Sequence, residues 1–342
     1  MNAPAVAVLA VGAFAVGWFC LLGSWAGSVA RPHVGPLAAV RVALWSGLIV
    51  ATVTLAVLSI FTPLVGTTAV LAAAVVTAAA GGAWALTRWR RGPAAGDGPA
   101  LTRAWWVAVP LGVLALVAIV VAHLAFGPVD NYDTGLYHLN AIQYAEHFST
   151  VPGLANLHTR LGTNVSGFNL AAFGANTPFG EDAFRLVVGL LLLVLAVDVA
   201  LRLLDGRPDT WRRPGTYVLL LAMAVCLPGL VAIGGATITS PSPDTLALIA
   251  SLAAGAYLAD AVATGERTWS AVAVLTAVLA ASMRAQLWAT FAVTVVVLAV
   301  AAYRERARRV GPRALSVAAG VLAGLTTAVM LARDALLSGW LL

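Results

Sequence analysis

The chain has 342 residues, of which 61% are hydrophobic and only 10% are charged. A typical soluble domain carries about 25% charged residues, so this composition excludes an ordinary soluble protein. The chain has 20 basic residues, all of them arginine, against 14 acidic residues, and a net charge of +6. Most arginines fall in short loops between apolar runs, where membrane orientation explains them better than nucleic-acid binding does.

Apolar runs of about 20 residues recur along the chain, and this length suits a helix that crosses a membrane. The pattern predicts an all-α bundle of about nine or ten transmembrane segments, with one long polar loop between two apolar halves. In chain order we expect segments at residues 4–26, a second run that ends at 61, then 64–86, 104–126, 183–204, 216–236, 245–263, two short helices within 269–303, and 315–330.

Arginine-rich loops predict which side of the membrane each connection occupies. Loops within residues 88–103, 202–213 and 304–313 are the richest in arginine, and basic loops stay in the cytoplasm. We place Arg31 and Arg41 in a further cytoplasmic loop after the first run. The polar segment, residues 127–180, is then expected on the outer face of the cytoplasmic membrane.

Residues 269–303 are too long for one span, and both of their ends appear cytoplasmic. We predict two short helices with a break at Ser282 to Arg284. Arg284 would then lie at depth or at the outer face, bound to a phosphate or paired with Asp198 or Asp260. The last run exits with Arg333 outside the membrane.

The polar segment carries three of the five histidines in a chain where polar side chains are scarce. Asp133 is a candidate N-cap of a juxtamembrane helix at residues 133–148, whose polar face includes Tyr137 and Asn140. Asp130 and Asp133 also form a candidate carboxylate pair, in which one member acts as a general base. The simpler alternative is that both only end turns or cap the helix.

The run NLHTRLGTN within the polar segment suits an anion or a sugar, because arginine forks and amides hydrogen-bond to both. Bonding within the loop is the alternative. Asp244 opens a later span and is either an N-cap or a ligand-binding residue. The residues of the run that we consider are Asn156, His158, Arg160 and Asn164.

No cofactor is expected from the motifs in the chain. A divalent metal is a minor alternative, because His138, Glu146, His147 and His158 match no zinc-binding spacing.

Four runs carry a family resemblance: YDTGLYHLNAIQYAEHF, VPGLANLHTRLGTNVSGF, TSPSPD and ARDALLSGW. Residues 127–342 resemble a family of bacterial multi-pass membrane proteins. More distantly, the layout is similar to the GT-C glycosyltransferases, which include protein mannosyltransferases and lipid A aminoarabinose transferases. The departures are three additional leading segments and the lack of the C-terminal soluble domain of many members. We therefore divide the chain into residues 1–103 and a GT-C-like core at 104–342.

The resemblance implies a polyprenyl-phosphate-linked sugar as donor, a membrane lipid environment, and sugar transfer to an unidentified acceptor at the outer face. It assigns the base to Asp133 or Asp130. A transporter or flippase for a lipid-linked saccharide and a non-catalytic envelope-assembly subunit remain alternatives. The residues expected to bind substrate are Tyr137, His138, Asn140, Asn156, His158, Arg160, Asn164, Asp244 and Arg284.

Overall fold

The computed structural model describes residues 3–91, 104–205, 210, 212–232, 238–304 and 310–339. Within these residues all regular structure is helical, apart from one isolated bridge between Glu266 and Val310. Eight of the described helices are long and apolar enough to cross a membrane, and two shorter apolar helices accompany them. The chain is therefore a multi-pass membrane protein, as its composition predicts.

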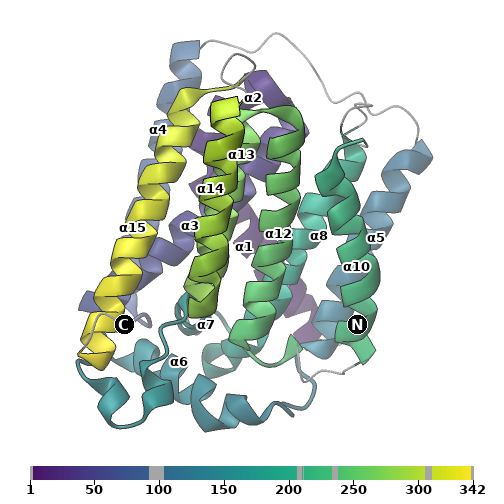
Figure 1. The fold of residues 1–342 in the computed structure, drawn as a ribbon. Coiled ribbons are helices and arrows are strands. Elements are labelled where there is room, and N and C mark those ends of the chain that lie inside the picture. The colour runs from purple at the N-terminus through teal and green to yellow at the C-terminus, as the bar shows by residue number, and fades with distance from the viewer. Residues whose placement is uncertain are drawn as a thin grey trace.

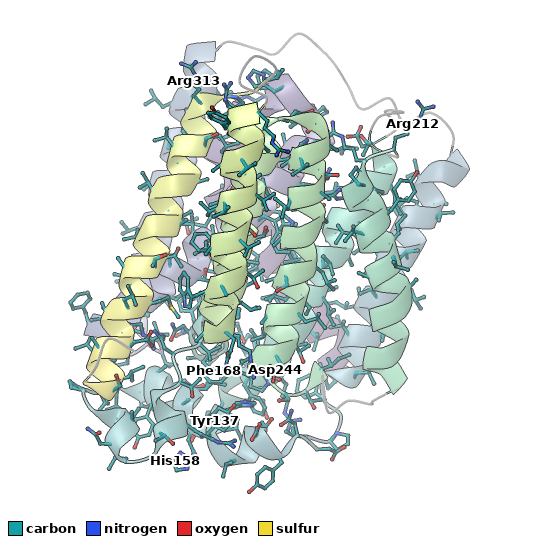
Figure 2. The ribbon with its side chains drawn as sticks, viewed as in Figure 1. Tyr137, His158, Phe168, Arg212, Asp244 and Arg313 are labelled. Atoms are coloured by element: carbon teal, nitrogen blue, oxygen red, sulfur yellow. The ribbon has the colours of Figure 1, made fainter. Side chains whose placement is uncertain are left out.

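The helices form a bundle in which the polar segment gathers at one end (Figure 1). Figure 2 shows Tyr137 and His158 at this polar end, and Arg212 and Arg313 at the opposite, basic end. The helices of the bundle are α1 (Ala3–Leu22), α2 (Ser24–Val34), α3 (Pro36–Phe61), α4 (Thr67–Arg91), α5 (Ala104–Leu124), α8 (Val187–Leu204), α10 (Pro214–Ala232), α12 (Pro243–Thr264), α13 (Arg267–Met283), α14 (Trp288–Arg304) and α15 (Arg313–Ser338).

Short helices build the polar end between α5 and α8. A π-helical turn leads directly into α6, and the remaining elements are single turns or short helices beneath the bundle (Figure 1). They are η1 (Thr134–His138), α6 (Leu139–His147), η2 (Leu154–Asn156), η3 (Thr159–Gly162), α7 (Ser166–Gly174) and η4 (Gly180–Leu186). The predicted juxtamembrane helix is confirmed, although its first turn is π-helical.

The predicted break within residues 269–303 is confirmed. Helix α13 ends at Met283 and α14 begins at Trp288, with Arg284 in an extended conformation between them. Because both helices run between the two ends of the bundle, this turn delivers Arg284 to the polar end (Figure 1).

The expected loop around Arg31 and Arg41 is wrong, because Arg31 lies in the last turn of α2 and Arg41 lies in α3. Helix α2 ends at Val34, and Gly35 turns the chain with a φ of 80°, which favours glycine. Helix α3 begins at the next residue, so Arg41 lies inside a membrane helix and is 1% exposed.

Small residues allow α3 to cross the α1–α2 bend at very short range. A Cβ atom on Gly47 would lie 1.7 Å from the carbonyl oxygen of Phe19, and one on Gly23 would lie 1.8 Å from that of Ala43. Since lipid and protein are equally apolar, membrane helices gain from such close packing rather than from hydrophobic burial. Glycine is required at both positions because backbone, not a movable side chain, occupies the space.

Charged side chains are buried near the basic end of the core. Arg41 Nε donates to Asp198 Oδ1 at 2.6 Å, and Trp45 Nε1 donates to Oδ2 at 2.8 Å. The Tyr257 hydroxyl and Arg202 Nε add two further bonds to the same carboxylate, at 2.7 and 3.2 Å. Asp198 therefore joins α3, α8 and α12 through side chains that are excluded from water.

The network continues to a second carboxylate. Arg202 Nη1 donates to Asp260 at 2.7 Å, and the backbone N–H of Gly215 donates to the other oxygen of Asp260 at 2.9 Å. Arg202 also lies over the ring of Tyr257, 4.7 Å from its centre. With Arg41 and Asp198, two cations meet two anions, which makes burial of the group tolerable.

Helices from residues 1–103 and from 104–342 share one hydrophobic core. Leu44 and Leu48 of α3 belong to the same buried cluster as Leu191 of α8 and Leu279 of α13. The leading helices thus pack into the rest of the bundle, and α3 contributes the cation Arg41 to its centre.

Candidate functional site

The π-helical turn η1 sets the position of Asp133. The Asp133 side chain makes no capping hydrogen bond, so its predicted role as an N-cap is wrong. Instead, the Asp133 backbone N–H donates to Asn131 Oδ1 at 2.9 Å, which starts the turn. The Asp133 carboxylate is free to point away from the helix end, and π-turns of this kind frequently occur at functional sites.

Asp133 pairs with Arg160, which lies 27 residues further along the chain. Arg160 Nη1 donates to Asp133 Oδ1 at 2.6 Å, and the two side chains are 49% and 43% exposed. The Arg160 guanidinium also lies 5.2 Å from the ring centre of Tyr137. The NLHTRLGTN run therefore folds back over η1 and places a cation beside the candidate base.

A second ion pair comes from the membrane helices. Arg284, at the end of α13, pairs with Asp244 in the first turn of α12. Ser242, not Asp244, occupies the N-cap position of α12, so the capping role of Asp244 is wrong, as is the expected pairing of Arg284 with Asp198 or Asp260. Arg284 lies at the polar end, where it is 39% exposed.

The two ion pairs converge on Tyr137. Burial raises the pKa of the Tyr137 hydroxyl, and the Asp133 carboxylate raises it further, whereas the Arg160 guanidinium lowers it. Asp244 raises and Arg284 lowers the pKa of the same hydroxyl, so both charges lie within electrostatic range of it. Figure 2 shows Tyr137 and Asp244 at the same end of the molecule. We call these five side chains the Tyr137 cluster.

His138 lies beneath the Tyr137 cluster and is 1% exposed. Its ring packs against Tyr137 at 4.3 Å and Phe168 at 5.4 Å between centres, and both ring nitrogens lack a partner in the described residues. Burial lowers its pKa to about 4, so the ring is neutral at pH 7. His138 thus supports Tyr137 from the inside instead of facing solvent.

The other expected site residues are not members of the Tyr137 cluster as defined above. Asn164 binds elsewhere: its amide donates to the carbonyl of Met330 and accepts from Arg333. His158 caps the turn that carries Arg160, through a bond from the Arg160 N–H to Nδ1 at 3.3 Å. Residues that are exposed and outside the cluster are Asp130, Asn140, Asn156 and His158.

The histidines and acids of the polar segment do not form a metal-binding group. Within the described ranges, no three His, Cys, Asp or Glu side chains lie close enough to hold an ion. His147 lies 3.9 Å from Glu146, whereas His138 is buried against aromatic rings.

Two polar residues that the sequence analysis did not select face a pocket at the polar end. Arg333 is expected outside the membrane, beyond the end of the last run. Helix α15 instead continues to Ser338, so Arg333 lies within this helix, where it is 7% exposed. Asn169 of α7 is 1% exposed and lines the same pocket. An arginine five residues before a helix end resembles an ordinary interfacial residue, so only the packing reveals it.

The chain was compared with protein families, curated proteins and solved structures. No curated protein and no solved structure matches it. A family model described as a domain of unknown function (DUF8201) matches residues 6–342, which includes the Tyr137 cluster and the leading helices. The chain belongs to the DUF8201 family.

Proposed function

We propose that the chain is a glycosyltransferase of the GT-C type, at the outer face of the cytoplasmic membrane. It would move a sugar from a polyprenyl-phosphate donor to an acceptor hydroxyl. The observation that carries the proposal is the Tyr137 cluster, in which an exposed carboxylate, Asp133, and two exposed guanidinium groups lie within electrostatic range of one tyrosine, next to apolar helices. A general base and a phosphate-binding cation are the groups that this reaction requires.

The role of Asp133 follows from which of its carboxylate oxygens already has a hydrogen-bond partner. Asp133 Oδ1 is bound to Arg160, whereas Oδ2 has no hydrogen-bond partner in the described part of the chain. Oδ2 would accept the proton of the acceptor hydroxyl while the hydroxyl oxygen attacks C1 of the sugar. The bond between C1 and the phosphate oxygen breaks, and its electron pair leaves with the polyprenyl phosphate.

Arg284 is the candidate partner of that leaving phosphate. Its present partner, Asp244, is 67% exposed, and exposed ion pairs contribute only about 0–1 kcal/mol. A phosphate can therefore replace Asp244 at little cost, and the guanidinium fork binds two phosphate oxygens at once. Arg160 adds a second positive charge and holds Asp133 in place.

The test is a transfer assay with the purified chain in vesicles that contain a panel of polyprenyl-phosphate sugars. A glycosyltransferase releases polyprenyl phosphate and forms a glycosylated acceptor. A flippase instead moves the donor between leaflets without product, and an assembly subunit does neither. Either of the last two results contradicts the proposal.

The outer-face location has its own test. In a background without Cys20 and Cys226, we expect Thr159→Cys to react with an impermeant thiol reagent in intact cells, because residue 159 is exposed at the polar end. Labelling that requires permeabilised cells would place the polar end in the cytoplasm and contradict the proposed site of transfer.

A further inference from the structure

A pocket lies between α6, α7, the end of α3 and the last turns of α15. Its empty volume is about 430 Å³, which includes solvent at the mouth of the pocket. The part that can hold the centre of a water-sized sphere is much smaller, about 30 Å³. That space accommodates about two water molecules, or the end of a small polar group, and excludes a whole sugar. The side chains that the argument uses are Ser59, Tyr144, Phe148, Phe168, Asn169 and Arg333.

Arg333 brings a cation into this pocket and makes no direct ion pair there among the described residues. Its Nη1 donates to Asn164 Oδ1 at 2.6 Å, and its Nε has no partner. The neighbouring Asp334 acts on the guanidinium from a distance and hydrogen-bonds to Asn164. A buried cation without an anion is costly, whether the surroundings are protein or lipid.

Asn164 is itself fixed, which makes the position of Arg333 definite. The Asn164 amide nitrogen donates to the carbonyl oxygen of Met330 at 2.8 Å, so its oxygen must face Arg333. The guanidinium is therefore held by Asn164, and the Asp334 carboxylate, which also hydrogen-bonds to Asn164, compensates its charge only in part and without direct contact.

Asn169 supplies a second polar group to the same pocket. It is 1% exposed, and neither its amide nitrogen nor its amide oxygen has a hydrogen-bond partner among the described residues. An unpaired buried amide costs about 1–3 kcal/mol. Two independent, unpartnered donors thus line one small cavity.

The pocket opens where the membrane surface is expected. Phe148, which forms part of its wall, is 54% exposed, and Phe61 at the end of α3 is 77% exposed. Aromatic side chains that remain exposed at helix ends are typical of the interface between lipid and water. A ligand can therefore enter from water or from the lipid headgroups.

We infer that this pocket binds the oxygens of a phosphate group, with Arg333 and Asn169 as donors. The phosphate belongs either to a lipid headgroup or to a phosphate in solution. Charge-assisted bonds from a guanidinium to such oxygens are the strongest that the site can form, and the small cavity accepts the end of the group only. The inference goes beyond the proposed sugar transfer and does not depend on the Tyr137 cluster.

The experiment measures the melting temperature of the full chain in neutral detergent at constant ionic strength. One arm adds inorganic phosphate, with chloride as the control anion, and the other adds phosphatidylglycerol to the micelles. We expect the melting temperature to rise to a plateau as ligand is added in one arm or both, because a ligand that binds only the folded state stabilises it. A rise with phosphate alone identifies a soluble ligand, and a rise with the lipid alone identifies a headgroup.

Variants connect that rise to the pocket. Arg333→Gln should weaken the apparent affinity at least about tenfold, equivalent to 1.4 kcal/mol. Arg185→Gln is the matched control, since Arg185 also lies at the polar end but is paired with Asp182. Asn169→Asp places a carboxylate on the pocket wall, so the protein should still fold while the response to phosphate is lost.

Three outcomes contradict the inference. The melting temperature rises in neither arm, it rises as much for Arg333→Gln as for the unmodified chain, or it responds to phosphate as strongly in Asn169→Asp as in the unmodified chain. If Arg333→Gln does not fold, the melting-temperature response of Asn169→Asp to phosphate is by itself the test of the inference. Asp133→Asn should respond like the unmodified chain, so failure of the proposed transfer activity leaves this result unaffected.

Discussion

Arg160 Nη1 lies 2.6 Å from Asp133 Oδ1, so a loop residue holds the carboxylate of the π-turn in a fixed position. The bond occupies one carboxylate oxygen and leaves the other toward solvent and substrate. Positioned proton acceptors are effective because their orientation is settled before the reaction starts. The pair therefore explains how an exposed aspartate can serve as the base of the proposed transfer.

Asp133→Asn should lower the rate of sugar transfer by about 10²–10⁴-fold, the usual contribution of a general base. Stability should change by less than about 1 kcal/mol, because the lost ion pair is exposed and caps nothing. The matched control is Asp182→Asn, which also breaks an exposed Asp–Arg pair at the polar end. Steady-state transfer and thermal unfolding measure the two effects. Full activity of both Asp133→Asn and Asp130→Asn would rule out a base at either position.

Arg284→Ala should raise the KM for the polyprenyl-phosphate donor at least about tenfold, as expected from loss of a charge-assisted hydrogen bond. Arg284→Lys should restore only part of the affinity, because lysine lacks the fork that binds two oxygens. Asp244→Asn frees Arg284 from its exposed partner and should leave donor affinity unchanged or improve it. Donor affinity that is the same in all three variants would remove Arg284 from the site.

His138 should make the stability of the chain depend on pH. Burial holds its folded pKa at about 4, below the ordinary 6.5; Asp133 and Asp244 oppose the shift, and Arg160 supports it. Between these values the unfolded chain binds the proton and the folded chain does not, so stability is complete above pH 6.5 and falls as the pH approaches 4. The loss is on the order of 3 kcal/mol.

His138→Phe should remove this loss, since phenylalanine fits between Tyr137 and Phe168 and cannot be protonated. His147→Phe is the control, because His147 is 55% exposed. Unfolding is followed at pH 7 and pH 4.5. An equal pH dependence in the His138→Phe variant and the unmodified chain would contradict the assignment.

Gly47→Ala should destabilise the bundle by about 3 kcal/mol or more, because the added methyl group meets the backbone of Phe19 and a rigid neighbour cannot yield. Gly17→Ala is the matched control: it lies in α1 with nothing within 4 Å of the added atom, so it should be neutral or slightly stabilising. The melting temperatures of the Gly47→Ala and Gly17→Ala variants, measured by thermal unfolding in detergent, test this difference. Equal stability of the two variants would show that the α1–α3 crossing adapts.

Segment lengths and arginine positions predict most of the membrane helices, including the break before Arg284, because span length and loop charge are local properties, whereas α2 and α7 are not predicted. The partners of the charged residues were not predictable in the same way. Asp198 was recognised as an intramembrane acid, but Arg41 was placed in a loop, since an arginine near a helix start resembles a loop residue until its partner is known. The burial of Arg333 is hidden from the sequence for the same reason, and Asp133 has the pattern of a cap because a π-turn has no sequence signature.

The distance in sequence between Arg41 and Asp198 has a consequence for how the chain is made. Helix α3 enters the membrane 157 residues before the carboxylate that neutralises Arg41 has been synthesised. An unpaired arginine at mid-helix costs about 2.5–3.5 kcal/mol on insertion scales, but Arg41 is only five residues into α3 and its long side chain reaches back to the headgroups. The bond between Arg41 and Asp198 can therefore form only after α8 has been synthesised, and until then Arg41 depends on the headgroups for its partners.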